Sequence, residues 1–237
     1  MVKLTIDGIQ VEAEKGTSVL HAAESVGIKI PTLCYIKDLL PDGSCRMCMV
    51  EIESRGRTKM ETACTAQVSE GLVVTTNSEK VRNARRNILD MLLSNHKTDC
   101  FSCPSNGDCK LQELCFEYGI ERTTYSGEQT ELPIDDSNKF FTYNPNLCIL
   151  CHRCVNTCHK VVGRGAIDTM ERGFDSAIGT PFHIDWADTN CESCGNCVQA
   201  CPTGALTMKR RKNYRKYQID KKVLTTCPHC ATGCQYY

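Results

Sequence analysis

The sequence predicts an α+β protein built from several small modules, and three observations support this. Nineteen of the 237 residues are Cys, whereas aromatic residues make up only 6% of the chain. Polar and apolar residues alternate around Asp7-Gly8, which is a strong hairpin signal. After Ser18 the apolar residues take a helical spacing. Because little apolar material is available for one large core, small modules of this kind need cross-links such as disulfides or bound metal.

Each element of the first module has its own signal. Residues 3–14 predict the hairpin, and Thr17 or Ser18 can cap the helix that follows. Gly27 is expected to supply the left-handed stop of that helix. Residues 71–76 are typical of a closing strand.

The rest of the chain divides by composition. Ser78 is expected to cap a second helix, which ends near Asn95. Residues 119–139 are polar and rich in Thr, Glu and Asp, which predicts a linker. The region 140–208 forms a further module, and residues 209–222 carry eight Lys or Arg. A solvated linker is the favoured interpretation of this basic run, and a docking surface for an acidic partner is the alternative.

The cysteines are expected to hold metal. The N-terminus has no apolar signal segment, and no apolar run reaches the ~18 residues that span a bilayer. These features predict a cytoplasmic chain without a membrane span, where disulfides are rare. Formal net charge is zero, with 28 basic and 28 acidic residues, so global charge indicates neither nucleic acid nor membrane as a partner.

The cysteines fall into five groups, and only Cys115 is left over. The groups are Cys34, Cys45, Cys48 and Cys64; Cys100, Cys103 and Cys109; Cys148, Cys151, Cys154 and Cys158; Cys191, Cys194, Cys197 and Cys201; and Cys227, Cys230 and Cys234.

The third and fourth groups share the Cys-x2-Cys-x2-Cys-x3-Cys spacing of two-cluster bacterial ferredoxins. In that pattern, three thiolates of a [4Fe–4S] cluster come from one run and the fourth from the other. The predicted ligand sets are Cys148, Cys151, Cys154 and Cys201 for one cluster, and Cys158, Cys191, Cys194 and Cys197 for the second. Zinc sites prefer paired Cys knuckles to four-Cys runs. His159 stands where the first run would often have Pro, but this removes no ligand.

The first group places a central Cys-x2-Cys between two distant single cysteines, which is the logic of a [2Fe–2S] site. The predicted ligands are Cys34, Cys45, Cys48 and Cys64. The loop around Gly43 can bring backbone N–H groups close to the cluster sulfurs. Zinc is the alternative metal at this spacing.

The second group has three cysteines, whereas a [4Fe–4S] cluster needs four ligands. His96 precedes Cys100 by four residues and is predicted to be the missing ligand, with Cys103 and Cys109 completing the set. Nitrogen in place of thiolate removes negative charge and generally raises the reduction potential. Cys115 is a rival fourth ligand, but its spacing from Leu111 and Leu114 favours a helix-face residue.

The order of these modules resembles the large iron–sulfur subunit of complex I and its relatives. Those relatives include the diaphorase subunit of NAD-reducing hydrogenases, the N-terminal region of iron-only hydrogenases and that of soluble NAD-dependent formate dehydrogenase catalytic subunits. The resemblance spans nearly the whole chain. It implies a β-grasp [2Fe–2S] ferredoxin module at 1–78, a small [4Fe–4S] module with one His and three Cys ligands at 79–118, a linker at 119–139 and a ferredoxin-like module with two [4Fe–4S] clusters at 140–208.

The last stretch, 209–237, joins the basic run to the final group. Cys227-Pro-His-Cys230-Ala-Thr-Gly-Cys234 resembles the entry to the molybdopterin domain of formate dehydrogenases and related bis-pterin oxidoreductases. There such a motif supplies three ligands of a further [4Fe–4S] cluster, and the fourth Cys lies downstream. Either the motif continues in a longer catalytic subunit or it is a remnant. Zinc bound by these cysteines and His229 is a weaker alternative.

The resemblance implies an oxidoreductase component of a soluble formate dehydrogenase, which relays electrons between a Mo or W bis-pterin site and a flavin-containing partner. The expected partners are a flavin- and NAD(P)-binding iron–sulfur subunit, a small [2Fe–2S] subunit and, as an alternative carrier, ferredoxin. The diaphorase iron–sulfur subunit of an NAD-linked hydrogenase is the alternative function.

A zinc-stapled scaffold or nucleic-acid-binding protein is a rival from another class, against which the two four-Cys runs argue. The sequence has no Gly-x-Ser-x-Gly, no phosphate-binding loop and no dinucleotide fingerprint. It therefore predicts neither a catalytic residue nor an NAD site within this chain.

Overall fold

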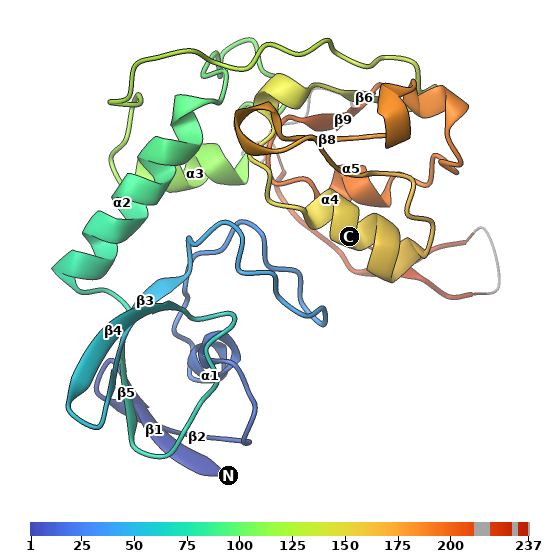
Figure 1. Ribbon diagram of the computed structural model, residues 1–237. Coiled ribbons are helices and arrows are strands. Elements are labelled where there is room, and N and C mark those ends of the chain that lie inside the picture. Colours follow the sequence, from blue (N-terminus) through green and yellow to red (C-terminus); the bar gives the residue numbers. More distant parts are fainter. Residues whose placement is uncertain (211–218, 229–231, 237) are drawn as a thin grey trace.

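The computed structural model describes residues 1–210, 219–228 and 232–236 (Figure 1). The chain begins with a sheet module, continues through the two helices α2 (Glu79–Ser94) and α3 (Lys110–Glu117), and then forms a module of short strands and helical turns. Within the described residues, none of the helices combines the length and the apolar character that a membrane span requires.

A mixed five-stranded sheet forms the first module, in the order β2-β1-β5-β3-β4. Its strands are β1 (Val2–Ile6), β2 (Ile9–Ala13), β3 (Met49–Ser54), β4 (Arg57–Thr62) and β5 (Leu72–Thr75). β1 and β5 pair in parallel, and the other neighbours are antiparallel. The predicted hairpin at 3–14 and the predicted strand at 71–76 are confirmed.

Helix α1 (Val19–Ser25) packs with the sheet in one apolar core. Ser18 caps it, because its Oγ accepts a hydrogen bond from the His21 N–H at 3.3 Å. Gly27 follows the helix at φ +79°, a left-handed conformation that favours glycine. Of the two predicted caps, the structure therefore selects Ser18, and the predicted stop is confirmed.

Helix α2 starts at the predicted cap, where Ser78 Oγ accepts from the Val81 N–H at 3.1 Å. It ends at the predicted boundary beside Asn95. Its Leu89 and Leu93 pack in one cluster with Leu111, Leu114 and Cys115 of α3. This confirms that Cys115 lies on a helix face next to those two leucines.

The buried Arg85 ties these helices to the sheet. Its Nη2 donates to the Met49 carbonyl at 2.8 Å, and its Nη1 donates to the Tyr118 hydroxyl at 3.1 Å. Because Met49 starts β3 and Tyr118 follows α3, one side chain fixes α2 against both.

The predicted linker 119–139 contains neither helix nor strand, only an isolated bridge between Asp135 and Tyr143. It runs along the top of Figure 1 and is fastened at several points. The Asp90 carboxylate accepts from Thr123 and Thr124, and the Thr130 N–H donates to Asn95 Oδ1 at 2.7 Å. The first part of the linker is thus attached to α2 and to Asn95, which follows that helix.

In the third module, β6 (Phe141–Tyr143) pairs with β9 (Leu206–Met208), so its two ends meet. Between them lie α4 (Arg153–Asn156), a π-helical turn (Thr157–Val162), the hairpin of β7 (Asp168–Met170) and β8 (Ala177–Gly179), and α5 (Asn196–Ala200). Short 3-10 turns cover Pro145–Leu147, Gly173–Asp175, Pro181–His183 and Trp186–Asp188. The rings of Phe141 and Trp186 meet edge to face at 5.1 Å and anchor the core.

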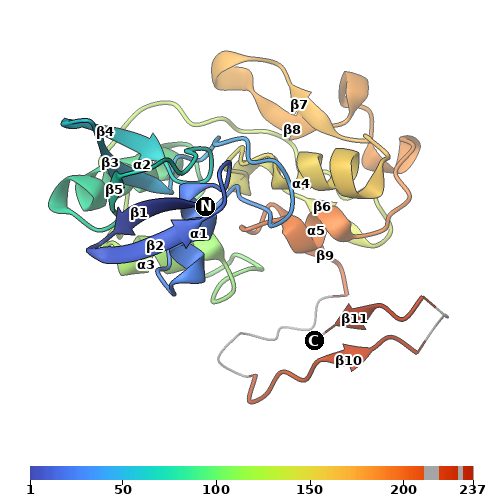
Figure 2. The ribbon, with the colours of Figure 1, turned by 90° about the horizontal axis from the view of Figure 1, so that it is seen from below.

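A last hairpin pairs β10 (Thr225–Thr226) with β11 (Gln235–Tyr236). Figure 2 shows it standing out from the rest of the chain. The structure does not decide between a linker and a docking surface for the basic run, because residues 211–218 lie outside the described residues.

Candidate iron–sulfur cluster sites

Four buried cysteines of the first module face one another in two pairs. Cys48 Sγ and Cys64 Sγ are 3.4 Å apart, and the Cys34 thiol is hydrogen-bonded to Cys45. Cys48 directly precedes β3 and Cys64 follows β4, so the sheet holds one pair. The loop between α1 and β3 carries the other. The structure therefore brings together all four residues of the first predicted set.

Hydrogen bonds within each pair lower the pKa of one thiol and raise the pKa of the other. The pKa of Cys45 is lowered, first by its hydrogen bond with the Cys34 thiol, and the pKa of Cys48 is lowered, first by its hydrogen bond with Cys64. Backbone hydrogen bonds from Met47 and Leu33 lower the pKa of Cys45 further. Such donors stabilise the negative charge of cluster sulfurs, so the loop fits a [2Fe–2S] group.

His96 supplies the strongest sign of a ligand site in the second group. Its side chain is buried, and among the described residues its Nδ1 has no hydrogen-bond partner. Burial lowers the pKa of His96 to about 4, so the imidazole is neutral at pH 7. A buried polar atom without a partner costs about 1–3 kcal/mol. Coordination of a metal by a neutral imidazole nitrogen would remove this cost.

The three cysteines of this group lie close enough for their thiols to interact electrostatically. Burial raises the pKa of Cys109 to about 11, and interactions with Cys103 and Cys100 add to the shift. Cys109 stands just before α3, where the N–H groups of Leu111 and Gln112 oppose that shift. N–H groups at a helix N-terminus favour a thiolate in this way.

Cys115 lies close to the same set. Burial raises its pKa to about 12, and Cys109 and Cys100 contribute next. It thus remains a rival to His96 for the fourth position, although it packs on the apolar face of α3.

The thiols of the third and fourth groups influence one another across the two runs. Burial raises the pKa of Cys154 well above its usual value, followed by the charges of Cys148, Cys151 and Cys201. Burial likewise raises the pKa of Cys197 to about 12, followed by Cys191, Cys194 and Cys158. Cys201 therefore lies near the Cys148 run, and Cys158 lies near the Cys191 run, which is the placement that the predicted crossing requires.

Backbone N–H groups point at these sulfurs. Donors lie 3.4 Å from Cys148 Sγ (Leu150), 3.3 Å from Cys158 Sγ (Ala166) and 3.4 Å from Cys191 Sγ (Ser193). Leu150 and Ser193 are left-handed, at φ +50° and +54°. Turns of this type form concave anion sites at iron–sulfur centres. Sequence analysis missed these donors, because neither residue is a glycine.

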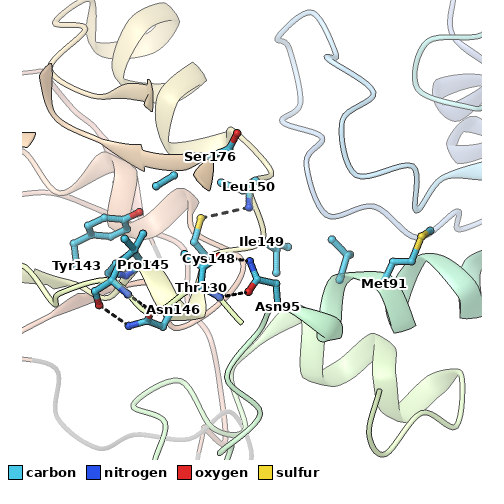
Figure 3. A pocket seen from close by; sticks show the side chains of 13 residues that line it. Met91, Asn95, Thr130, Tyr143, Pro145, Asn146, Cys148, Ile149, Leu150 and Ser176 are labelled. Carbon is cyan, nitrogen blue, oxygen red and sulfur yellow. Dashed lines mark hydrogen bonds between the residues drawn. The ribbon is translucent and has the colours of Figure 1, made fainter. Parts of the chain in front are cut away.

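A small cavity of about 170 Å³ reaches Cys148 (Figure 3). Its walls come from the end of α2, the linker and the start of β8. Figure 3 shows Asn95 bonded to Thr130 on one side and Asn146 beside Pro145 on the other.

The structure describes only part of the final cysteine group. The Cys227 N–H donates to the Cys234 carbonyl at 2.8 Å, which closes the loop between β10 and β11. Cys230 and His229 lie outside the described residues. Across the described part of the chain, no three His, Cys, Asp or Glu side chains gather into the ligand shell of a single metal ion. None of the described cysteines forms a disulfide.

Small ferredoxin-like modules with converging thiols, most of them buried or half-buried, define this chain as a multi-cluster iron–sulfur protein. Family models agree along its length. Residues 1–79 match a 2Fe-2S iron-sulfur cluster binding domain, and residues 85–124 match the iron-sulfur binding region of NADH-ubiquinone oxidoreductase-G. Residues 140–207 match the ferredoxin-like domain of NADH-quinone oxidoreductase subunit 3. Residues 190–236 match a 4Fe-4S dicluster domain, which overlaps the previous match.

Known proteins resemble the chain over most of its length. It is 42% identical to the NADPH-Fe(3+) oxidoreductase subunit alpha of Geobacter sulfurreducens, over 99% of this chain and 27% of that protein. It is also 38% identical to the mitochondrial NADH-ubiquinone oxidoreductase 78 kDa subunit of Candida albicans, over 88% of this chain and 28% of that protein. The chain therefore spans about a quarter of the length of these relatives.

A solved structure extends the comparison. A chain in the crystal structure of an NAD+-reducing [NiFe]-hydrogenase in its H2-reduced state superposes with a TM-score of 0.81 at 31% identity, covering 88% of each chain. The chain belongs to the iron–sulfur family formed by the N-terminal region of NADH-ubiquinone oxidoreductase-G proteins and by related hydrogenase chains.

Proposed function

We propose that this chain relays electrons inside an NAD(P)-linked oxidoreductase complex. The observation that carries the proposal is the succession of four sets of candidate ligands along the chain. Contacts link the second set to the third and the third to the fourth. Cys197 contributes to the raised pKa of Cys154, so the third and fourth sets adjoin. The Lys110 N–H at the start of α3 donates to the Pro202 carbonyl at 2.8 Å, which joins the second set to the third.

The proposed ligands are those expected from the sequence. One [2Fe–2S] cluster would bind Cys34, Cys45, Cys48 and Cys64, and three [4Fe–4S] clusters would bind His96 with Cys100, Cys103 and Cys109; Cys148, Cys151 and Cys154 with Cys201; and Cys191, Cys194 and Cys197 with Cys158. Cys227, Cys230 and Cys234 would serve a further [4Fe–4S] cluster. Bound clusters supply one-electron transfer, and each electron gained at one site is lost at another.

The protein side chains set the conditions for that transfer. The buried thiols hold their sites away from water, and the backbone N–H groups at Cys148, Cys158 and Cys191 stabilise negative charge there. Neutral His96 brings less negative charge than a thiolate would. The sites would therefore differ in potential along the chain.

Finer features of the architecture belong to the same proposal. The strand order of the first module, with α1 packed on it, supports a β-grasp fold at 1–78. The match over 140–207 supports the proposed module 140–208, and the match over 85–124 covers most of the proposed module 79–118. The limits of the linker 119–139 and of the segment 209–237 rest on composition, because the match over 190–236 crosses residue 209. The cytoplasmic location remains a prediction.

The proposed partners are a flavin- and NAD(P)-binding iron–sulfur subunit and a small [2Fe–2S] subunit, with ferredoxin as an alternative electron carrier. A soluble formate dehydrogenase, with a Mo or W bis-pterin site next to the last cysteines, remains the finer proposal. It rests on the motif from Cys227 to Cys234. Similarity to the NAD+-reducing hydrogenase chain supports a hydrogenase-linked role as the second candidate.

Anaerobic purification of the chain, followed by iron and sulfide analysis and low-temperature EPR, tests the relay. The proposal expects about 14 iron atoms per chain from the four clusters with four ligands each, and about 18 when the further cluster of Cys227, Cys230 and Cys234 is also assembled. It also expects one [2Fe–2S] signal and several [4Fe–4S] signals. Colourless protein loaded with zinc would refute it. In the native complex, NADH or NADPH should reduce the clusters. Reduction of the clusters by formate would support the formate dehydrogenase role, and reduction by hydrogen would support the hydrogenase-linked role.

A further inference from the structure

Arg153 stands between two predicted ligands, Cys151 and Cys154, yet its side chain turns to other parts of the chain. Its Nε donates to the Ala200 carbonyl at 2.7 Å, and its Nη1 donates to the Tyr35 carbonyl at 2.8 Å. Ala200 directly precedes Cys201, and Tyr35 directly follows Cys34. One guanidinium therefore connects the backbone beside a ligand of the first set with that beside a ligand of the third.

The same two regions meet at a second place. Asp42, in the loop between Cys34 and Cys45, accepts from Asn156 of α4 and lies 3.5 Å from Lys160 Nζ. Ser44 Oγ lies 3.4 Å from His152 Nδ1. These contacts are more exposed than those of Arg153, and exposed ion pairs contribute little. The half-buried Arg153 is therefore the stronger link between the first and third modules.

Resting on the proposed electron relay, we propose that Arg153 is a positioning residue between the [2Fe–2S] site and the site of Cys148, Cys151, Cys154 and Cys201. It holds the Cys34 loop and the Cys201 loop at a fixed separation. It also places a permanent positive charge beside Cys151.

Two properties of arginine suit it to this place. Its planar fork offers donors in different directions, so Nε and Nη1 can serve two carbonyls at once. Hydrogen bonds from a charged donor are roughly twice as strong as neutral ones. A lysine has the charge but a single donor point, so it cannot hold both carbonyls with the same geometry.

The charge has a separate effect. The Arg153 guanidinium binds the carbonyl next to Cys201, so its positive charge lies beside the site of Cys148, Cys151, Cys154 and Cys201. A reduced cluster has one more negative charge than an oxidised one, so the same cation would favour reduction at that site. The positioning effect of Arg153 and the effect of its charge can thus be measured separately.

The test compares Arg153→Gln, Arg153→Lys and the native chain, each purified anaerobically with its clusters. Arg57→Gln, an exposed charge loss on β4, is the matched control. The measurements are iron content, EPR-monitored redox titration and the magnetic interaction between the [2Fe–2S] signal and its neighbour. Arg153→Gln should shift the reduction equilibrium of the neighbouring [4Fe–4S] cluster about tenfold toward oxidation, or about 59 mV for one electron. Its magnetic interaction with the [2Fe–2S] cluster should weaken.

In Arg153→Lys, the equilibrium constant for reduction of the neighbouring [4Fe–4S] cluster should stay within about threefold of the native value. The magnetic interaction should still weaken. Arg57→Gln should change neither. Full iron content with native potential and native interaction in Arg153→Gln would overturn the role of Arg153. Iron loss in both Arg153 variants would also overturn it, because the residue would then serve assembly alone. A native chain without a [2Fe–2S] signal would instead overturn the relay on which the inference rests.

Discussion

Gly204 packs directly against the sulfur of Cys103, although the two residues belong to different modules. A β-carbon at Gly204 would lie 2.7 Å from Cys103 Sγ, 3.3 Å from Leu147 Cδ1 and 3.4 Å from the β-carbon of Ser105. Real β-carbons essentially never approach a heavy atom so closely. The glycine is therefore required for space, and it brings the loop after Cys201 into contact with the second donor set.

Gly204→Ala should displace Cys103 and empty the second site alone. The expected result is a loss of about four iron atoms per chain and of one EPR signal, with the [2Fe–2S] signal retained. Gly179→Ala is the matched control, because its β-carbon would meet only the flexible Met170 side chain at 3.2 Å. Full iron content in Gly204→Ala would show that the loop can move aside.

His96→Cys should still assemble a cluster in the second site but lower its potential. A thiolate adds negative charge where the neutral imidazole adds none, and the expected shift is on the order of 100 mV downward. EPR-monitored redox titration measures it. His183→Cys, at an exposed histidine of the third module, is the control. An unchanged potential in His96→Cys would remove His96 from the ligand set and favour Cys115.

Local signals made much of the fold predictable. Ser18 and Ser78 cap helices whose apolar spacing follows at once, so each cap can be recognised within a few residues. The approach of Cys201 to the Cys148 run and of Cys158 to the Cys191 run was likewise predictable from spacing. These features depend on residues close in sequence or on a repeated motif.

Long-range contacts and short elements were not predictable. Gly204 and Cys103 are separated by most of the third module, and a glycine gives no sign of what it packs against. The β7–β8 hairpin has strands of three residues, too short to show an alternating period. The backbone N–H donors of Leu150 and Ser193 depend on left-handed backbone conformations, which residues other than glycine rarely adopt.

Arg85→Met should destabilise the junction between the sheet and the helices. It removes two charge-assisted hydrogen bonds, to Met49 and Tyr118, for a loss of about 2–4 kcal/mol. For a chain of this size, the thermal midpoint should fall by roughly 5–15 °C. Circular dichroism of the cluster-loaded chain measures it. Arg82→Met, at an exposed position of the same helix, should stay within about 2 °C of the native midpoint.

Cysteine variants test the crossing of the third and fourth sets. Cys201→Ser should disturb the cluster of Cys148, Cys151 and Cys154, although it belongs to the other run. Cys158→Ser should likewise disturb the cluster of Cys191, Cys194 and Cys197. Each single variant is expected to lose about four iron atoms or to convert one cluster to a smaller form. Iron analysis and Mössbauer spectroscopy record the change.

The decisive comparison uses double variants. If Cys201 and Cys148 serve one cluster, changing both to Ser should remove no more iron than one change alone, since residues of one unit are not additive. Changing Cys201 and Cys191 should remove about twice as much iron, because those residues then serve different clusters. The dicluster match over 190–236 offers a competing arrangement, in which the second run pairs with the Cys227–Cys234 group. In that case Cys201 and Cys148 would behave additively, and Cys201 with Cys227 would not. The electrostatic contact of Cys154 with Cys201 favours the first outcome.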